Sequence, residues 1–273
     1  MDILGGLVRI KISCVCQKNI FVPYNYHYKL HSAIYHIIEK SSSEFSSFLH
    51  DTGFIDPESN KPMKLFTFSK IFFENARRTQ NGFENVKNIS FFFSTLVEKS
   101  LEHLVLGLFS DQILRLNFFG ENYKFNITNV ESMPEPTIKS EMKFICLSPI
   151  ACSISKEINH RMTKHFLDYM NPDERERFVE NIKNNLLRKY RIINKKDFAG
   201  NSEFDLSFDP QYIIKRNGRI SKLISFKNGI KIKGMEAPFT INADPELIEI
   251  GFETGFGEKN SAGFGFVELI DEM

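Results

Sequence analysis

A glycine-rich run in the C-terminal part of the sequence constrains the fold more than any other stretch of the chain. Residues 255–265 read Gly-Phe-Gly-Glu-Lys-Asn-Ser-Ala-Gly-Phe-Gly, and an apolar strand pattern over residues 264–270 follows directly. Glycine is used where a backbone takes positive φ or lies close to a ligand. Two Gly-Phe-Gly units around a short polar cluster therefore predict a loop that presents amide N–H groups to an anion.

The order of residues in this run excludes the two common nucleotide-binding loops. A P-loop places Gly-Lys-Ser or Gly-Lys-Thr between a strand and a helix, whereas this run follows an apolar helical segment and leads into a strand. A dinucleotide-binding fingerprint needs a third glycine at position 260, which is Asn260. Both nucleotide motifs are therefore rejected.

Length and composition narrow the class of protein. The 273 residues are 42% hydrophobic and carry a formal net charge of +1, which allows one large domain or two ordinary ones and gives no global bias in partners. No basic N-terminal region precedes an apolar stretch, and no run approaches the roughly 18 apolar residues of a membrane span. Four scattered cysteines predict buried free thiols in a reducing cytoplasm.

The first half of the chain predicts a β-α-β-β-α-β arrangement. Alternation over residues 7–14 predicts a strand that Pro23 ends, and Asn25 can cap the periodic helix that follows. The other elements expected here are a short helix near 45–49, strands at 64–73 and 89–93 around a turn at 77–82, a helix from Thr95, and strands at 113–118 and about 123–131. This order is that of a ferredoxin-like domain.

The second half repeats this order after a predicted linker at residues 132–137, where Pro134 and Pro136 lie among polar side chains. The elements expected are a strand pair at 144–147 and 151–155, a helix opened by Pro172, strands near 203–208, 221–227 and 230–234, a helix from Asp244, and a last strand after the glycine-rich run. The sequence therefore predicts an α+β fold of two tandem ferredoxin-like domains, residues 1–135 and 136–273.

Positive charge is concentrated between Lys183 and Lys233. This segment holds thirteen basic and four acidic residues, a local charge of +9. In a near-neutral chain such a segment can hold a phosphate backbone. It can equally be a lysine-rich solvated face, and charge alone does not separate the two interpretations.

Taken together, these features resemble one protein family. The resemblance rests on Val22-Pro-Tyr-Asn25, Leu30-His-Ser-Ala-Ile-Tyr35, Phe48-Leu-His-Asp51, Lys64-Leu-Phe-Thr-Phe68, Leu147-Ser-Pro-Ile150 and the glycine-rich run. The chain is similar over nearly its whole length to the CRISPR-associated repeat endoribonucleases, which cut CRISPR precursor transcripts within each repeat. The resemblance implies two RNA-recognition-like (ferredoxin-like) domains, no metal or other cofactor, and cleavage that leaves a 2′,3′-cyclic phosphate, or an end derived from it, and a 5′-hydroxyl.

The resemblance also implies which residues cut the RNA. Metal-free cleavage uses the 2′-hydroxyl as the nucleophile, so the enzyme must move protons and stabilise charge on the phosphorane. Histidine suits the proton transfers and lysine suits the charge. Similar segments of the family place these roles at Tyr35, His50 and Lys64. We expect His50 to be the general base, Tyr35 to position the 2′-hydroxyl or assist proton transfer, and Lys64 to stabilise the phosphorane.

His31 is the main rival to His50. His27, His31 and Tyr35 are spaced i, i+4, i+8 along the first predicted helix, and family members differ in which histidine they use. His31 and His50 can therefore act as a base and acid pair. A metal site at His27 and His31 is not expected, because Tyr28 stands where a zinc-protease helix carries its glutamate. Each candidate also has an ordinary explanation, as a rim aromatic, a helix cap or a solvated edge lysine.

In this setting the glycine-rich run is predicted to contact the RNA backbone while facing the first helix. The residues expected to touch RNA are Gly255, Gly257, Lys259, Asn260, Ser261, Gly263 and Gly265. Polar side chains would contact phosphate or ribose, and the glycines would let backbone amides approach.

Three functions stay open at this point. The first is a metal-independent endoribonuclease that acts on CRISPR repeat RNA, and the histidine, tyrosine and lysine set favours it. The second is a non-catalytic subunit that only binds the repeat, and the third and weakest is a small-molecule-binding ferredoxin-like module. We expect a cytoplasmic protein without membrane association, whereas a homodimer and association with other CRISPR effector subunits stay open.

Overall fold

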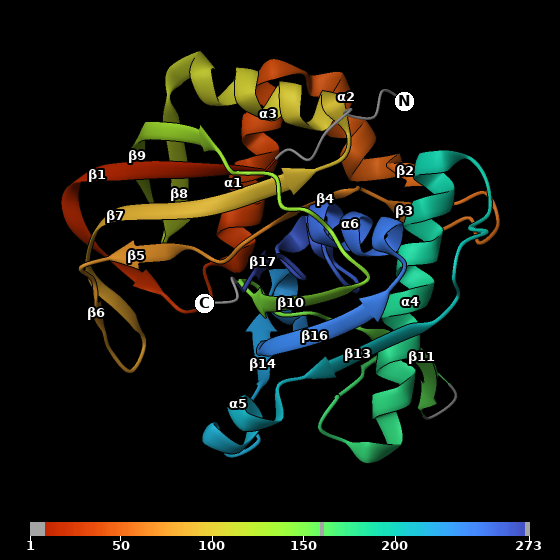
Figure 1. Ribbon diagram of the computed structural model, residues 1–273. Helices are drawn as coiled ribbons and strands as arrows, with labels where there is room; N and C mark the ends of the chain where they lie inside the picture. Colours follow the sequence, from red (N-terminus) through yellow and green to blue (C-terminus); the bar gives the residue numbers. More distant parts are fainter. Residues whose placement is uncertain (1–8, 159–160, 271–273) are drawn as a thin grey trace.

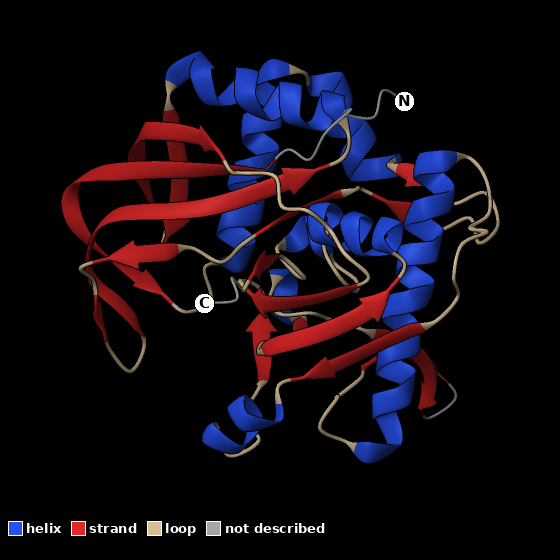
Figure 2. Ribbon diagram, in the orientation of Figure 1, coloured by secondary structure: helices blue, strands red, loops and turns tan. Residues whose placement is uncertain are grey.

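Two antiparallel β-sheets, one from each half of the chain, organise the protein (Figures 1 and 2). The computed structural model describes residues 9–158 and 161–270. The first sheet has the order β4 (Phe66–Phe68), β7 (Gly82–Thr95), β1 (Arg9–Pro23), β9 (Glu121–Ser132) and β8 (Ile113–Phe118), and β5 (Phe72–Glu74) and β6 (Arg77–Arg78) also pair with β7. The second sheet has the order β13 (Phe204–Phe208), β16 (Pro238–Ala243), β10 (Glu141–Cys146) and β17 (Val267–Leu269).

Two helices of the first half share a core with its sheet. Leu30, Ile34 and Ile38 recur at helical spacing and are buried on one face of α1 (His27–Ser41). The backbones of α1 and α3 (Glu98–Asp111) touch at Gly107, where a Cβ atom would lie 1.9 Å from the carbonyl oxygen of Ile37. The elements that follow α1 are α2 (Ser43–Ser47), the π-helix η1 (Phe48–Thr52), and the short strands β2 (Phe54–Ile55) and β3 (Pro62–Met63).

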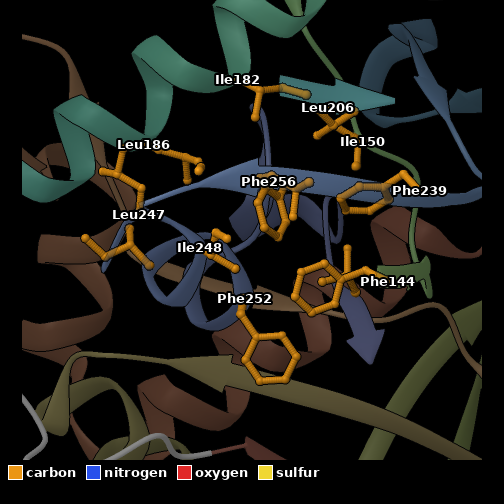
Figure 3. Close-up of a cluster of buried hydrophobic side chains, with 14 of the residues drawn as sticks. Phe144, Ile150, Ile182, Leu186, Leu206, Phe239, Leu247, Ile248, Phe252 and Phe256 are labelled. Carbon is orange, nitrogen blue, oxygen red and sulfur yellow. The ribbon is translucent and has the colours of Figure 1, made fainter. Parts of the chain in front are cut away.

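The second half has a complete ferredoxin-like order, with β10 between β16 and β17. Asn171 and Asp244 each accept a backbone hydrogen bond in the first turn of a helix, and a proline follows each of them. The helices are α4 (Pro172–Asn194) and α6 (Pro245–Thr254). Both pack on the sheet through a core that includes Phe144, Phe239 and Phe252 (Figure 3).

Two hairpins and a short helix are added to this order. They are β11 (Ser153–Ile158) with β12 (Arg161–Phe166), β14 (Ser221–Ser225) with β15 (Lys231–Met235), and α5 (Pro210–Lys215). The 3-10 turn η2 (Lys227–Gly229) joins β14 to β15, and this hairpin contacts α1 of the first half.

The predicted fold of two ferredoxin-like domains is confirmed, with corrections to single elements. Tyr26, not Asn25, is the N-cap of α1. The predicted strand pair at 144–147 and 151–155 does not form, because β10 pairs with β16 and β17 whereas β11 pairs with β12. Strand β9, not β8, lies beside β1. Separately, no helix within residues 9–158 and 161–270 has the length and apolar character needed to cross a membrane.

The two halves are in contact through buried residues, among them Arg9 and Thr67 of the first half. The guanidinium of Arg9 lies 3.7 Å and 4.2 Å from the ring centroids of Phe252 and Phe266, and it donates to the carbonyl oxygen of Val267. The glycine-rich run packs beside β4, and the hydroxyl of Thr67 donates to the carbonyl oxygen of Phe264 at 3.1 Å. Residues 133–140 connect the two sheets, and the predicted domain boundary after residue 135 lies in this segment.

Replacing Gly263 with alanine is expected to lower the melting temperature of the isolated protein. Gly263 has a φ of +84°, and its Cβ would lie 2.4 Å from the Phe68 ring, so overpacking adds about 1–3 kcal/mol to a backbone strain of about 1–2 kcal/mol. Gly229→Ala is the matched control, because Gly229 has a φ of +73° and nothing within 4 Å of its Cβ position. Equal melting temperatures of the two variants in scanning fluorimetry would contradict this packing.

Candidate active site

His31 is half-buried on the edge of α1 that faces the glycine-rich run. Its Nδ1 lies 2.8 Å from the carbonyl oxygen of Ser261. Because a carbonyl oxygen only accepts hydrogen bonds, Nδ1 carries the proton and the neutral ring keeps a lone pair on Nε2. Burial lowers the pKa of His31, and the nearby His50 and Lys227 lower it further, against the opposing effect of the Ser261 carbonyl. His31 is therefore set up to accept a proton at Nε2.

Tyr35 lies one turn further along α1, between two histidines. Its ring centroid is 4.7 Å from that of His31 and 6.4 Å from that of His50. Burial raises the pKa of Tyr35 to about 12, although a hydrogen bond with the side chain of Ser261 opposes the rise. The phenol therefore keeps its proton near neutral pH and can donate a hydrogen bond.

His50 belongs to the π-helix η1, a rare conformation that is frequent at functional sites. Its side chain is 75% exposed, and Nδ1 lies 2.7 Å from Oδ1 of Asp51, to which it donates. The carboxylate thus orients the ring and leaves Nε2 facing away from Asp51. The site combines one half-buried and one exposed histidine on either side of Tyr35.

Lys64 completes the group that the sequence predicted. Its Nζ donates to the carbonyl oxygen of His50 at 3.3 Å, and burial lowers its pKa while Asp51 opposes this. The next residue, Leu65, is buried with a φ of +56°, a strained conformation for a leucine. The structure thus brings together His31, Tyr35, His50 and Lys64, and we refer to these four candidate catalytic residues as the catalytic cluster.

His27 does not join the catalytic cluster, although it shares a helix edge with His31. It is buried, stacks on Tyr26 with ring centroids 4.8 Å apart, and burial lowers its pKa to about 4. Within residues 9–158 and 161–270, no group of three or more His, Cys, Asp or Glu side chains could hold a metal ion.

Fewer residues of the glycine-rich run are available to contact RNA than the sequence predicted. Gly255, Gly257, Gly263 and Gly265 are all buried. The amides of Gly263 and Gly265 donate to the carbonyl oxygens of Asn260 and Pro149, so these two N–H groups already have protein acceptors. The side-chain amide of Asn260 also donates to two carbonyl oxygens of the run. Of the seven residues predicted to touch RNA, Lys259 is exposed and Asn260 and Ser261 are half-buried, so Lys259 is the most accessible.

Lys189 is a site residue that sequence reasoning missed. It is buried, and its Nζ donates to the carbonyl oxygens of Thr254 and Gly255 and, at 2.8 Å, to Oδ1 of Asn260. Burial lowers its pKa from 10.5 to about 7. The sequence could have indicated this residue, because Lys189 lies at a core-facing position of α4, on the same apolar stripe as Phe178, Ile182 and Leu186. Lys189 holds the end of α6 and the glycine-rich run together.

A basic cleft of about 820 Å³ lies beside the catalytic cluster and is lined from both halves of the protein. Its basic lining residues are Lys61, Lys64, Lys164, Arg177, Arg188, Lys189 and Lys259. The one acidic residue among the described lining residues is Glu258, which pairs with Lys164 at 3.1 Å. Such an excess of positive charge suits a phosphate backbone.

The predicted basic segment from Lys183 to Lys233 does not form one phosphate-binding face. Of the basic residues of this segment, only Arg188 and Lys189 line the cleft. Arg191 instead pairs with Asp56 at 3.0 Å and Glu58 at 2.6 Å, and Lys233 pairs with Asp168. Part of its charge therefore serves ion pairs within the protein.

Similarity to known proteins extends over most of the chain. Residues 133–269 match the family "CRISPR associated protein Cas6, C-terminal", and residues 21–131 match "CRISPR-associated protein Cas6, N-terminal". A Pyrococcus furiosus protein named "CRISPR-associated endoribonuclease Cas6" is 30% identical over 91% of this chain and 83% of its own length.

Two further relatives agree with these matches. "CRISPR-associated endoribonuclease Cas6 1" of Methanocaldococcus jannaschii is 29% identical over 97% of this chain and 94% of its own length. A solved structure titled "CRISPR associated protein Cas6" superimposes with a TM-score of 0.76 at 28% identity, covering 97% of this chain and all of the other.

Lys189→Met is expected to change how stability depends on pH. Between about pH 7 and the ordinary lysine value, the unfolded chain binds a proton that folded Lys189 does not, so stability rises with pH in this window. In the variant the free energy of unfolding should no longer rise with pH in this window, and the slope that is lost is at most about 1.4 kcal/mol per pH unit. Urea titrations at several pH values in the window measure this slope. Lys183→Met is the control on the same helix, since Lys183 lies near the surface, and a variant slope equal to wild type would refute the role of Lys189.

Proposed function

This chain belongs to the Cas6 family of CRISPR-associated proteins, and we propose that it is an endoribonuclease that cleaves precursor CRISPR RNA within its repeats. The observation that carries this proposal is the catalytic cluster at the border of a basic cleft. The proposed chemistry is metal-independent attack of the 2′-hydroxyl on the adjacent phosphate. It forms a 2′,3′-cyclic phosphate and releases a 5′-hydroxyl.

His31 is the proposed general base. Its lowered pKa favours the neutral ring, and the Ser261 carbonyl keeps the proton on Nδ1, so Nε2 can take the proton of the 2′-hydroxyl. Sequence alone favours His50 as the base, with His31 as its rival. The burial and the fixed tautomer are the reasons for preferring His31.

His50 is the proposed general acid, which protonates the departing 5′-oxygen. The Asp51 carboxylate accepts from Nδ1 and can stabilise positive charge on the ring. Tyr35, whose phenol stays protonated, would donate a hydrogen bond to the reacting 2′-oxygen or to the phosphate. Lys64 would stabilise the negative charge that develops on the phosphorane.

The basic cleft is the proposed path of the RNA backbone towards the catalytic cluster. Lys64 belongs to both, so a strand held in the cleft would reach the reacting groups without leaving the basic surface. Lys259 and Ser261, which also line the cleft, would contact phosphate or ribose. A cytoplasmic location, a homodimer and binding to other CRISPR effector subunits stay predictions.

A non-catalytic repeat-binding subunit is the second candidate function. The cleft supports binding in either case, but a subunit that only binds has no need for two oriented histidines beside a protonated tyrosine. Product formation from a repeat RNA in the presence of EDTA separates the two.

Replacing either His31 or His50 with alanine is expected to slow cleavage of a repeat RNA by about 10²- to 10⁴-fold, because each variant loses one proton-transfer group. RNA affinity should change little. Single-turnover assays in EDTA with end-labelled RNA measure both quantities. His36→Ala is the matched control, since His36 is an exposed residue of the same helix that contacts Glu39. Undiminished cleavage by His31→Ala would remove it as the base.

The pH dependence of single-turnover cleavage follows from the lowered pKa of His31. A base with a lowered pKa stays neutral further into the acid range, so the rising limb of the rate profile should lie below the ordinary histidine value of about 6.5. The residual activity of His31→Ala should lack this limb. A limb at or above that value in the wild-type protein would contradict the assignment.

A further inference from the structure

The hairpin formed by β14 and β15 is a basic element that the proposed function has not used. Residues 221–235 carry four lysines and no acidic residue. Leu223 and Ile230 are exposed on it, at 62% and 56%. Apolar and basic side chains together on an exposed hairpin suit a ligand with both flat apolar and anionic parts, as single-stranded RNA has.

The tip of this hairpin lies directly against the catalytic cluster. The ring centroid of Phe226 is 5.4 Å from that of His31 and 5.2 Å from that of Tyr28, which lies one turn before His31 on α1. The hairpin comes from the second half of the chain and α1 from the first. Phe226 also packs against a small buried cluster that includes Ala262 and Phe264 of the glycine-rich run, so its ring is held from the protein side as well.

Tyr28 and Phe226 are aromatic rings that folding has not fully buried. Both are half-exposed, in contrast to the fully buried Phe264 beneath them. Lys227 is exposed, and its Nζ lies 5.7 Å from the Tyr28 ring centroid. Two accessible rings with a lysine beside them form the usual elements for stacking a base and binding its phosphate.

We propose that Tyr28, Phe226 and Lys227 form a nucleotide subsite that holds an unpaired base next to the scissile phosphate. The inference rests on the proposed endoribonuclease function. The described lining of the basic cleft contains none of these three residues, and the catalytic cluster touches the cleft through Lys64 and the hairpin through His31. The RNA strand thus crosses the cluster from the cleft and is anchored on the far side by the stacked base.

The subsite can be tested by the fluorescence of a base analogue placed in a repeat RNA that the wild-type protein cleaves. The RNA carries 2-aminopurine at one of the two nucleotides flanking the cut, with a 2′-deoxyribose at the cut to block the reaction. Binding should quench the probe at one of these positions. Tyr28→Leu and Phe226→Leu should abolish the quenching and weaken binding by about 5- to 150-fold. Phe119→Leu, at an exposed phenylalanine in the turn between β8 and β9, is the control and should keep both.

An abasic nucleotide at the quenched position separates stacking from a structural role. The abasic RNA should bind the wild-type protein more weakly than intact RNA, by the same factor as the Phe226→Leu substitution weakens binding. Binding of the abasic RNA to Phe226→Leu should be little weaker than binding of intact RNA to that variant. Equal losses in wild type and variant, or quenching that survives both leucine substitutions, would overturn the subsite. Absence of product from an unblocked repeat RNA would instead overturn the proposed function.

Discussion

The position of the glycine-rich run beside the catalytic cluster depends on Lys189, a lysine that is only 2% exposed at the wall of the basic cleft. The acceptors of Lys189 are carbonyl oxygens, two from the end of α6 and one from Asn260. A helix C-terminus carries partial negative charge, which offsets the cost of burying the ammonium group. Asn260 in turn holds the run that contains Ser261, whose carbonyl fixes the proton of His31. The second half of the chain thus sets the chemical state of a side chain in the first.

Three unusual backbone conformations lie beside this cluster. His50 lies in a π-helix, Leu65 is left-handed next to Lys64, and Lys259 has a φ of +63° beside the cleft. Each of these costs stability relative to regular structure, and packing elsewhere must offset it. Other left-handed residues, such as Asn75 and Phe119, lie in turns away from the cluster. The departures at Leu65 and Lys259 differ from these because they lie where the candidate side chains converge, as is expected near a functional site.

The sequence predicts those parts of the fold that depend on local patterns. Helices α4 and α6 are foreseen from a capping residue followed by proline, and α1 from its apolar stripe. The strand partners of β10 are distant in the sequence, so its pairing with β16 and β17 is missed. β16 is also missed, since it is short and begins with Pro238, which is unfavourable for a central strand. The glycine pattern indicates that some group lies close to the backbone of the run, but it does not show whether that group is RNA or a protein side chain. At Gly263 the group is the ring of Phe68.

The contact between His31 and Ser261 also means that the catalytic cluster can form only late in the synthesis of the chain. These residues are 230 positions apart in the sequence, and Arg9 and Val267 are 258 apart. The first half can form its own sheet and helices as it leaves the ribosome, because domains generally fold as units. Its histidine, however, acquires a fixed tautomer only after the glycine-rich run has been synthesised and docked. With His31 as the proposed base, a nascent or truncated chain would hold a folded first domain without a complete cluster, and RNA cleavage would have to wait until synthesis is finished.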